Sequence, residues 1–331
     1  MAEITGQGTT FNLPNYVGEL FAVTPSDTPF LSAIGGLTGG EQTTSTLFQW
    51  QGFDLRTPDA ARQRVEGANA PTAEERVRFN VTNVVEIHQE SLELSYTKMA
   101  ATGQYASTGS AHTGAVGIAG SNPVTDEMSW QTQQQLVQIA RDVEVSFLTG
   151  AFANPASNAD PRKTRGILSA ITTNVITNAT AAPLTKAVVL DLLQQVWTSG
   201  GIQVSETATL MCNAWQKRML TDIFVTQANY QEQSRNVGGV NVTTVETDFG
   251  RLNIMLNRHM PTDTVLVVSL DECAPVFMNI PGKGFLFTEP LSKVGAADRY
   301  QVYGEIGLKY GNEKAHGKIT GLTTAPPAEG A

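Results

Sequence analysis

The chain has no basic side chain before Arg56 and no lysine before Lys98. A secretory signal begins with a basic segment, so the opening MAEITGQG does not predict one. The sequence also lacks any run of about 20 apolar residues, the length that a membrane-spanning helix needs. We therefore expect no membrane partner for this chain.

Cysteine and histidine are scarce, with two and four copies in 331 residues. The cysteines have no CxxC spacing and the histidines form no HExxH or similar ligand pattern. We therefore predict no metal, no cofactor and no disulfide framework, and we expect both thiols to be reduced and buried. The two cysteines are Cys212 and Cys273, and the four histidines are His88, His112, His259 and His316.

Motifs of catalysis are almost absent too. The triplet Asp248-Phe249-Gly250 lacks the other kinase motifs, and PGKG at 281–284 lacks the frame of a phosphate-binding loop, so we interpret both as turns. The sequence therefore predicts that the protein is not an enzyme. A soluble hydrolase whose Ser, His and Asp meet only in space stays open as an alternative.

What is present is a globular composition with an acidic balance. With 41% hydrophobic residues, the chain is long enough for a large core divided between two domains. Its net charge of −9 argues against a surface that grips phosphate backbones, which needs clustered Lys and Arg. We therefore expect no sequence-specific nucleic-acid binding.

The N-terminal region is apolar but is interrupted by Pro14, Pro25 and Pro29. Since proline removes a backbone donor and clashes with the preceding turn, we predict an extended arm here and no helix. The large side chains of the arm must bury either on the chain's own body or on a neighbouring copy. They are Phe11, Leu13, Tyr16, Leu20, Phe21, Phe30, Leu31 and Ile34.

Two strand-like segments follow, at 44–56 and 76–97, joined by about 20 polar residues that are too long for an ordinary hairpin turn. They predict a long hairpin that projects from the body. Apolar residues change from odd to even positions within the second segment, which predicts a bulge or bend between about 87 and 92.

The remaining elements predict an α+β protein. Residues 99–125 are interpreted as a flexible connection, and 126–148 as a long helix with a single apolar stripe at Leu136, Ala140, Val143 and Phe147. A compact α/β unit is expected over 183–289, with one helix capped by Thr185 that carries Val189 to Trp197 and one capped by Asn213. Its expected strands lie at 207–212, 240–247, 251–256 and 264–270, and a late strand at 299–310 is expected to return to the first body.

This order of elements resembles the major capsid proteins of tailed bacteriophages, the Johnson fold that is shared with herpesvirus shell floors and encapsulins. The resemblance runs from about residue 10 to 322. It is carried by TFNLPNYVGEL, TPSDTPFLSAIGG, HQESLELSYTKMAATGQ, RGILSAITTNV, LLQQVWTSGG and TEPLSKVGAADRYQVYGEIGLKYGNEKAHGKITGL.

The resemblance implies a division of the chain into named parts. They are an N-terminal arm at 1–43, an E-loop β-hairpin at 44–97, a peripheral domain at 98–182 with its spine helix at 126–148, an axial domain at 183–289, a returning peripheral-domain strand at 290–322 and a C-terminal tail at 323–331.

The function implied is a structural one: self-assembly, as hexamers and pentamers, into an icosahedral shell that encloses packaged double-stranded DNA. Assembly would take place in the bacterial host cytoplasm, with a portal, a separate scaffolding protein and a decoration protein as further partners. An encapsulin-like compartment, or a tail or decoration protein, are the alternatives. The inter-subunit contact candidates are Phe11, Leu13, Tyr16, Phe21 and Phe30 of the arm and Arg56, Arg62, Arg64, Arg76 and Arg78 of the hairpin.

Some members of this fold join their subunits through a lysine of the E-loop, but the E-loop here carries only arginine. A guanidinium stays protonated and cannot act as that nucleophile. We therefore expect no covalent cross-links.

Overall fold

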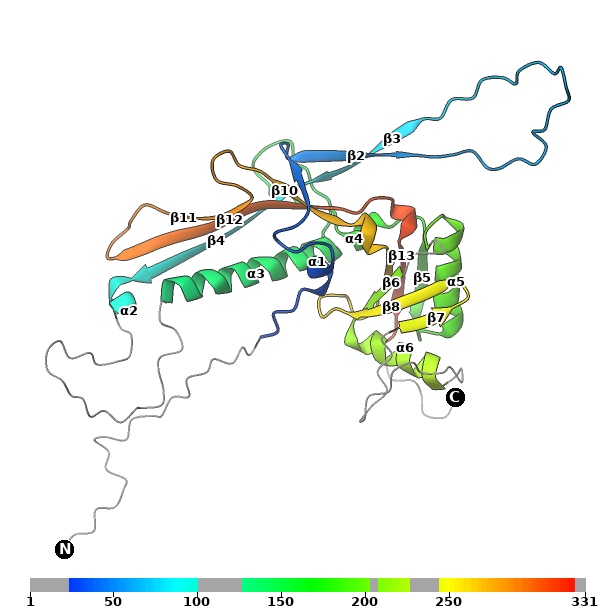
Figure 1. Ribbon diagram of the computed structural model, residues 1–331. Coiled ribbons are helices and arrows are strands. Elements are labelled where there is room, and N and C mark those ends of the chain that lie inside the picture. Colours follow the sequence, from blue (N-terminus) through cyan, green and yellow to red (C-terminus); the bar gives the residue numbers. More distant parts are fainter. Residues whose placement is uncertain (1–23, 101–126, 203–207, 227–243, 325–331) are drawn as a thin grey trace, which may run out of the picture. The chain divides into compact units, whose positions relative to one another are not determined.

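The computed structural model describes residues 24–100, 127–202, 208–226 and 244–324 (Figure 1). These residues fall into two compact units. The smaller unit contains 24–26, 90–100, 127–137 and 288–302, and the larger contains the other described residues. The division passes through four elements: α3 (Glu127–Thr149), β4 (Glu86–Ser95), β11 (Leu286–Pro290) and β12 (Ala297–Lys309).

A five-stranded sheet has β12 at its centre. Its order is β1 (Glu41–Thr43), β10 (Ala274–Met278), β12 and β11 (Leu286–Pro290), and β4 also pairs with β12. β1 runs parallel to β10, and β10 runs antiparallel to β12. Val302, Ile306 and Leu308 of β12 are buried, and Tyr310 follows them, as the alternation in the sequence predicts.

The prediction that the N-terminal region contains no helix is wrong for its last part. α1 (Pro29–Ala33) is a helix of five residues with Pro29 at its start. A proline at the first helical position leaves no hydrogen bond unmade, because that N–H has no intrahelical partner in any helix. The proline therefore begins this helix. Residues 1–23 lie outside the described residues.

The predicted hairpin is present. β2 (Leu47–Phe53) and β3 (Arg78–Val84) pair antiparallel in a sheet of their own, with Leu47 opposite Val84 and Phe53 opposite Arg78. Every residue from 53 to 80 is exposed, so the end of the hairpin and its loop extend away from the elements of their unit (Figure 1).

The predicted bulge between 87 and 92 is wrong in position. The strand is interrupted at Val85, between β3 and β4, and from Glu86 to Ser95 the two faces of β4 alternate regularly. The Val85 amide donates to the carbonyl of Thr46. The interruption therefore places Glu86 and His88 on the same face as Leu94, while Ile87 is exposed.

The second sheet has six strands, in the order β5, β13, β9, β6, β8, β7. β5 and β13 lie outside the range 183–289 that the sequence predicts for this unit. β13 pairs with β9 and β5, so the segment 290–322 contributes to two sheets and is not one returning strand. The strands are β5 (Val175–Ala182), β6 (Ala208–Cys212), β7 (Thr244–Thr247), β8 (Gly250–Leu256), β9 (Val265–Val268) and β13 (Gly317–Leu322).

The remaining helices are short, except for two that pack on this sheet. Those two are α5 (Lys186–Thr198) and α6 (Ala214–Thr226). The hydroxyl of Thr185 caps α5 by accepting from the Val188 amide at 3.4 Å, as predicted. The others are α2 (Tyr96–Ala100), α4 (Ile167–Ala170), η1 (Leu270–Glu272) and η2 (Glu313–Ala315).

The core of the larger unit lies between α5, α6 and one face of the six-stranded sheet. Alternate strand residues such as Leu210 and Val267 join Leu192 and Leu220 in it. Trp197 was predicted with this apolar face, but its side chain is 53% exposed. The reason is that it lies one position beyond Val196, outside the stripe that faces the sheet.

Three further predictions are confirmed. α3 begins and ends within one residue of its predicted bounds, with Val143 and Phe147 buried. Asp248 and Phe249 form the turn between β7 and β8, where Thr247 pairs with Gly250. The region of Lys283 is a turn, closed by a bridge between Ile280 and Gly284. The predicted connection at 99–125 lies almost wholly outside the described residues.

Candidate functional site

The base of the β2–β3 hairpin contacts backbone and side-chain groups at the end of β12 and directly after it. We call Gly307, Leu308, Tyr310 and Gly311 the hairpin seat. The indole of Trp50 stands edge-on to the ring of Tyr310, with 4.9 Å between ring centroids, and its N–H donates to the carbonyl of Gly311 at 2.8 Å. The hairpin is therefore oriented by a directional bond as well as by packing.

Glycine at position 307 permits this close approach. A Cβ there would lie 2.8 Å from both the ring of Phe48 and the carbonyl oxygen of Val84, closer than real Cβ contacts. Any side chain would push the hairpin base away from β12.

Asn83 joins the hairpin base to two other segments and is completely buried. Its amide nitrogen donates to the carbonyl of Leu308 at 2.7 Å and to that of Arg165 at 3.2 Å, while its oxygen accepts from the Arg165 amide at 2.8 Å. A buried amide with every group satisfied fixes one geometry, since each lost bond would leave a buried polar atom unpaired.

Glu86, directly after the interruption at Val85, holds the next segment. Its carboxylate lies 2.9 Å from Nε2 of His88 and accepts from the Thr164 amide at 3.0 Å. Burial opposes ionisation of Glu86, but the bonds from His88 and Thr164 outweigh it, so the pKa of Glu86 is lowered. The group is therefore a fixed anion at neutral pH.

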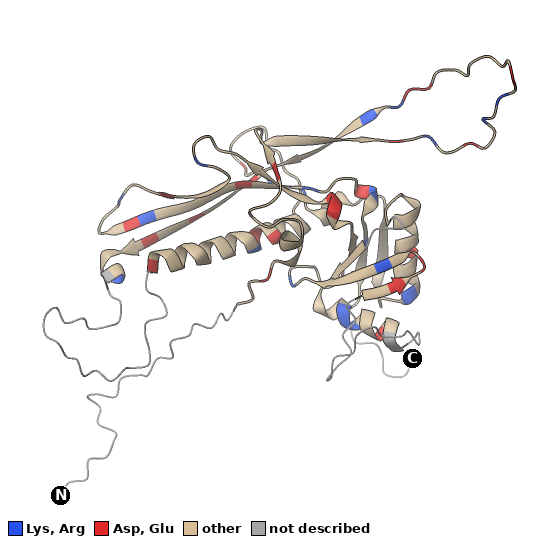
Figure 2. Cartoon of the chain, viewed as in Figure 1, with Lys and Arg blue, Asp and Glu red and all other residues tan. Residues whose placement is uncertain are grey.

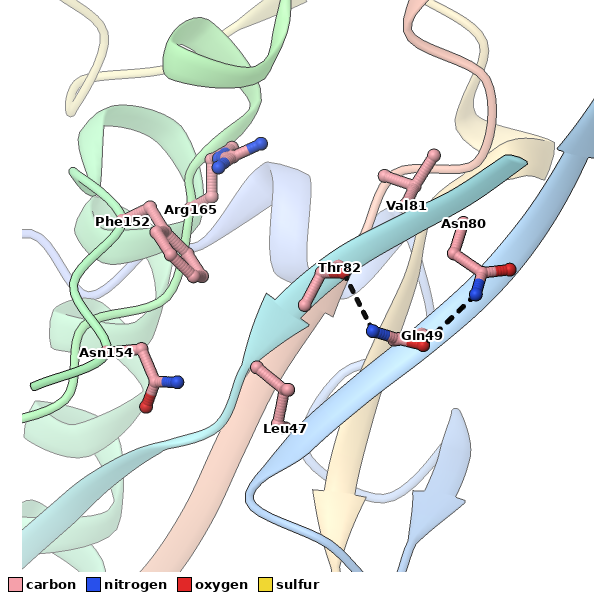
Figure 3. Close-up of a pocket in the computed structure, with 8 residues that line it drawn as sticks. All are labelled: Leu47, Gln49, Asn80, Val81, Thr82, Phe152, Asn154 and Arg165. Atoms are coloured by element: carbon pink, nitrogen blue, oxygen red, sulfur yellow. Dashed lines mark hydrogen bonds between the residues drawn. The ribbon is translucent and has the colours of Figure 1, made fainter. Parts of the chain in front are cut away.

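An open groove of about 650 Å³ lies beside the hairpin base. Figure 3 shows Gln49 and Thr82 of the hairpin on one side and Phe152 and Arg165, from the segment after α3, on the other. Gln49 donates to Thr82 at 3.1 Å, and the Arg165 guanidinium lies 4.7 Å from the centre of the Phe152 ring. The full lining is Leu47, Gln49, Asn80, Val81, Thr82, Phe152, Asn154 and Arg165.

One face of the hairpin carries apolar side chains from its base outward, but its own chain covers only the base. Trp50 and its partner Val81 are at least half-buried, whereas Phe79 is 51% exposed and Val77 is 70% exposed. Residues of alternate positions on a strand lie on the same face, so Trp50, Val81 and Phe79 form one stripe, and the exposed Val77 directly precedes β3 at its outer end. The outer part of this stripe has no cover within the described residues.

The loop at the end of the hairpin carries both signs of charge (Figure 2). Glu74 binds Arg62, Arg76 at 3.0 Å and Arg56 at 3.7 Å. Three of the five predicted contact arginines thus meet an acid of their own loop. Arg78 donates to Gln51 at 3.2 Å, and no ion pair to Arg64 or Arg78 is found within the described ranges.

A second fixed point lies at α1. Both oxygens of the Glu144 carboxylate, which is fully buried, accept backbone amides from α1: Phe30 at 3.0 Å and Leu31 at 2.7 Å. The side-chain amide of Asn257 donates at 2.5 Å. Burial raises the pKa of Glu144, and these hydrogen bonds oppose that effect without cancelling it.

Of the arm residues that the sequence nominates for contacts, Phe30 is completely buried in its own chain, together with Leu31. Phe11, Leu13, Tyr16 and Phe21 lie outside the described residues. Burial on the chain's own body, one of the two alternatives, therefore describes the α1 part of the apolar region.

Sequence reasoning missed Trp50, Asn83, Glu86 and Glu144. One signal was available for Glu144, because it lies four residues after Ala140 and therefore on the apolar stripe of α3. A carboxylate on a buried stripe needs hydrogen-bond donors that are buried with it. Asn83 gave a similar signal, because alternation places it on the same face as Val81 and Val85.

In the part of the chain that the structure describes, no cluster of His, Cys, Asp and Glu is placed to hold a metal ion. Among the same residues no helix has the length and hydropathy of a membrane span. Both cysteines are buried, and burial raises the pKa of Cys212 to about 12.

The family model described as SU10 major capsid protein matches residues 3–323. The chain belongs to this family of phage major capsid proteins. A curated relative, the major capsid protein of Escherichia phage Phieco32, is 23% identical, and the match covers 94% of each chain. The resemblance to tailed-phage capsid proteins is thereby confirmed, and the family is one of structural shell components.

Solved structures agree on the fold. The capsid protein of cyanophage A-1(L) aligns with a TM-score of 0.67 at 10% identity, over 96% of this chain and 98% of that chain. The capsid of an empty GTA particle aligns with a TM-score of 0.63 at 11% identity, over 98% of this chain and 99% of that chain. The SrpI encapsulin of Synechococcus elongatus aligns with a TM-score of 0.57 at 12% identity, over 96% of this chain and 95% of that chain. The α+β capsid fold predicted from the sequence is confirmed, and since encapsulins share it, the family match decides for a phage capsid protein.

Proposed function

We propose that many copies of this capsid protein assemble, as hexamers and pentamers, into an icosahedral shell that encloses packaged double-stranded DNA. The observation that carries the proposal is the outer stripe of the hairpin, Val77 and Phe79, which the described part of its own chain leaves exposed. Exposed apolar surface on a long two-stranded element is costly unless a partner covers it. A neighbouring copy supplies that cover in a shell.

The hairpin is built for such a role. Trp50 and Asn83 fix its base to the hairpin seat, so its direction is set before any partner arrives. A preoriented element loses less conformational entropy on binding than a disordered one. The charged loop contributes to register, because Arg64 and Arg78 remain available to acids of a neighbouring subunit.

The shell encloses the DNA without recognising its sequence. A net charge of −9 suits a container wall, because DNA under confinement should not adhere to it. Assembly takes place in the bacterial host cytoplasm, with a portal, a separate scaffolding protein and a decoration protein as further partners.

Electron microscopy of the full chain, expressed alone and separated by size, tests the proposal. Closed shells or rings of capsomers are expected. If only monomers or dimers form, even when the neighbouring structural genes of the phage are co-expressed, the proposal is wrong. The nucleic-acid content of particles from infected cells then separates a genome container from an encapsulin-like compartment, which would hold protein cargo.

A further inference from the structure

His316 lies between η2 and β13, and its side chain is completely buried. Nε2 lies 2.8 Å from the carbonyl oxygen of Tyr310, which can only accept, so Nε2 carries the hydrogen. Nδ1 accepts from the Ser269 amide at 3.2 Å. These two contacts require the neutral imidazole in one tautomer.

The two partners of the ring belong to different sheets. Ser269 directly follows β9 of the six-stranded sheet, whereas Tyr310 directly follows β12 and is part of the hairpin seat. The ring of Tyr310 packs on Trp50, and the neighbouring carbonyl of Gly311 accepts from the Trp50 indole. The imidazole thus connects the six-stranded sheet to the base of the hairpin through residues 310 and 311.

The backbone around His316 is held independently of its ring. The side-chain amide of Asn174 donates to the carbonyls of His316 at 2.8 Å and Lys314 at 2.7 Å. The charge of the ring can therefore change while the ring stays in place, facing the same two partners.

A second proton on the ring would have to occupy Nδ1. That nitrogen would then present an N–H to the N–H of Ser269, so an accepted hydrogen bond would become a repulsion between two donors in a dry site. We propose that His316 is an acid-labile joint: protonation at Nδ1 releases Ser269 and loosens the hairpin seat from the six-stranded sheet.

The charged groups that act on the ring set the direction of the effect. Burial lowers the pKa of His316, while the Tyr310 carbonyl and the carboxylates of Glu272 and Glu313 oppose that change. Both carboxylates also accept hydrogen bonds from backbone amides. Glu272 accepts from Asn312, and Glu313 accepts from Thr172 and Thr173. The other charges on the packed elements are Asp271 of η1, Lys314 of η2 and Lys318 of β13, which donates to the Leu168 carbonyl.

Because the pKa in the folded state is lowered, the folded protein binds fewer protons than the opened one. The joint is therefore stable above the ordinary histidine pKa of about 6.5 and weakens as the pH falls below that value. The uptake of one proton on opening changes the opening equilibrium by up to about tenfold per pH unit.

Amide hydrogen exchange of the full chain, read by mass spectrometry and corrected for intrinsic rates, measures this opening. From about pH 7 to about pH 5, protection of peptides covering 47–53 and 265–270 should fall by about tenfold or more. His316→Gln should remove the fall, since a glutamine amide can donate to Tyr310 and accept from Ser269 without titrating. The matched control His259→Gln should behave like the wild type.

A second variant keeps the proposal testable if His316→Gln fails to fold. Glu272→Gln retains an acceptor for the Asn312 amide but removes a negative charge that favours protonated His316 in the folded state. The folded-state pKa of His316 should fall further, so the loss of protection should begin at the same pH as in the wild type but continue to lower pH and become larger in total. Wild-type protection that does not change with pH, an equal loss in His316→Gln, or a smaller total loss in Glu272→Gln than in the wild type would each overturn the proposal.

Discussion

The carboxylate of Glu144 lies 2.7 Å from the backbone nitrogen of Leu31, although the two residues are 113 positions apart in the chain. The same carboxylate accepts from Phe30 and Asn257, so three buried donors meet one anion. The first turn of α1, whose amides have no intrahelical partners, is thereby satisfied by a side chain of α3.

Removal of this anion should destabilise the folded subunit. Glu144→Ala leaves three buried donors without an acceptor, and we expect a loss of about 3 kcal/mol or more in the free energy of unfolding. Urea unfolding of the unassembled subunit measures it. Asp142→Ala, an exposed acid on the same helix, is the matched control and should change stability by less than about 0.5 kcal/mol. Equal effects of the two substitutions would show that α1 does not depend on Glu144.

Glu86 predicts a pH dependence in the same direction as that of His316, but at lower pH, because the ordinary pKa of a carboxyl group is lower than that of an imidazole. Since the pKa of Glu86 is lowered in the folded state, its contribution to stability is present above the ordinary value of about 4.5 and is lost as the pH falls through the folded value. Glu86→Gln should therefore cost more stability at neutral pH than in acid. Unfolding by urea at a series of pH values measures the difference, and a constant difference between the two proteins would contradict it.

The orientation of the hairpin should depend on the indole N–H of Trp50. Trp50→Phe keeps an aromatic ring beside Tyr310 but removes the bond to Gly311, which should cost about 1 kcal/mol. The expected local result is faster amide exchange in the peptide covering 47–53. Trp197→Phe is the control, because its indole is 53% exposed, and exchange in that peptide should then stay at the wild-type rate. No change in Trp50→Phe would mean that packing alone holds the hairpin.

The outer stripe of the hairpin should matter for assembly and not for folding. Val77→Ser combined with Phe79→Ser should leave the free energy of unfolding of the subunit within about 0.5 kcal/mol of the wild type, because both side chains are exposed. The yield of particles, counted by electron microscopy, should fall strongly. Gln51→Ser, on the opposite face of the hairpin, is the control. Normal particle yield in the double variant would remove the stripe from the interface.

The loop arginines give a charge-based test of the same interface. Arg62→Glu with Arg64→Glu should impair assembly, partly because Arg62 would no longer bind Glu74 and partly because like charges would meet a neighbouring acid. Arg62→Lys with Arg64→Lys preserves the charge and is the control. Shells that form normally when the charge of both arginines is reversed would exclude this role.

Mature wild-type particles should also give a single subunit band on a denaturing gel, since no lysine lies in the hairpin and no covalent cross-link between subunits is expected.

Much of the fold could be predicted from the sequence because local rules decide it. The limits of α3 follow from an uninterrupted apolar period that ends at Gly150, and α5 follows from Thr185 as its cap. The hairpin follows from two alternating segments around a long polar loop. Each of these signals depends on neighbours within a few residues, and their order along the chain indicated the capsid family that the comparisons then established.

The candidate site could be predicted only in outline. The sequence indicated that the hairpin loop carries arginines, but it could not show that Glu74 binds three of them. The assignment of β13 to the six-stranded sheet, the interruption at Val85 and the burial of Phe30 also depended on partners far along the chain.

The sequence by itself determined the long helix α3, the capped helix α5 and the β2–β3 hairpin, and it showed which side chains are apolar enough to need cover. Only the tertiary structure decided which polar groups are buried together: Asn83 with Leu308, Glu144 with Leu31, and His316 with Ser269. The physical reason is that a periodic pattern reports the mean environment of a segment. A buried hydrogen bond, in contrast, depends on the position of two groups to within a fraction of an ångström, and the chain reaches that position only when it has folded.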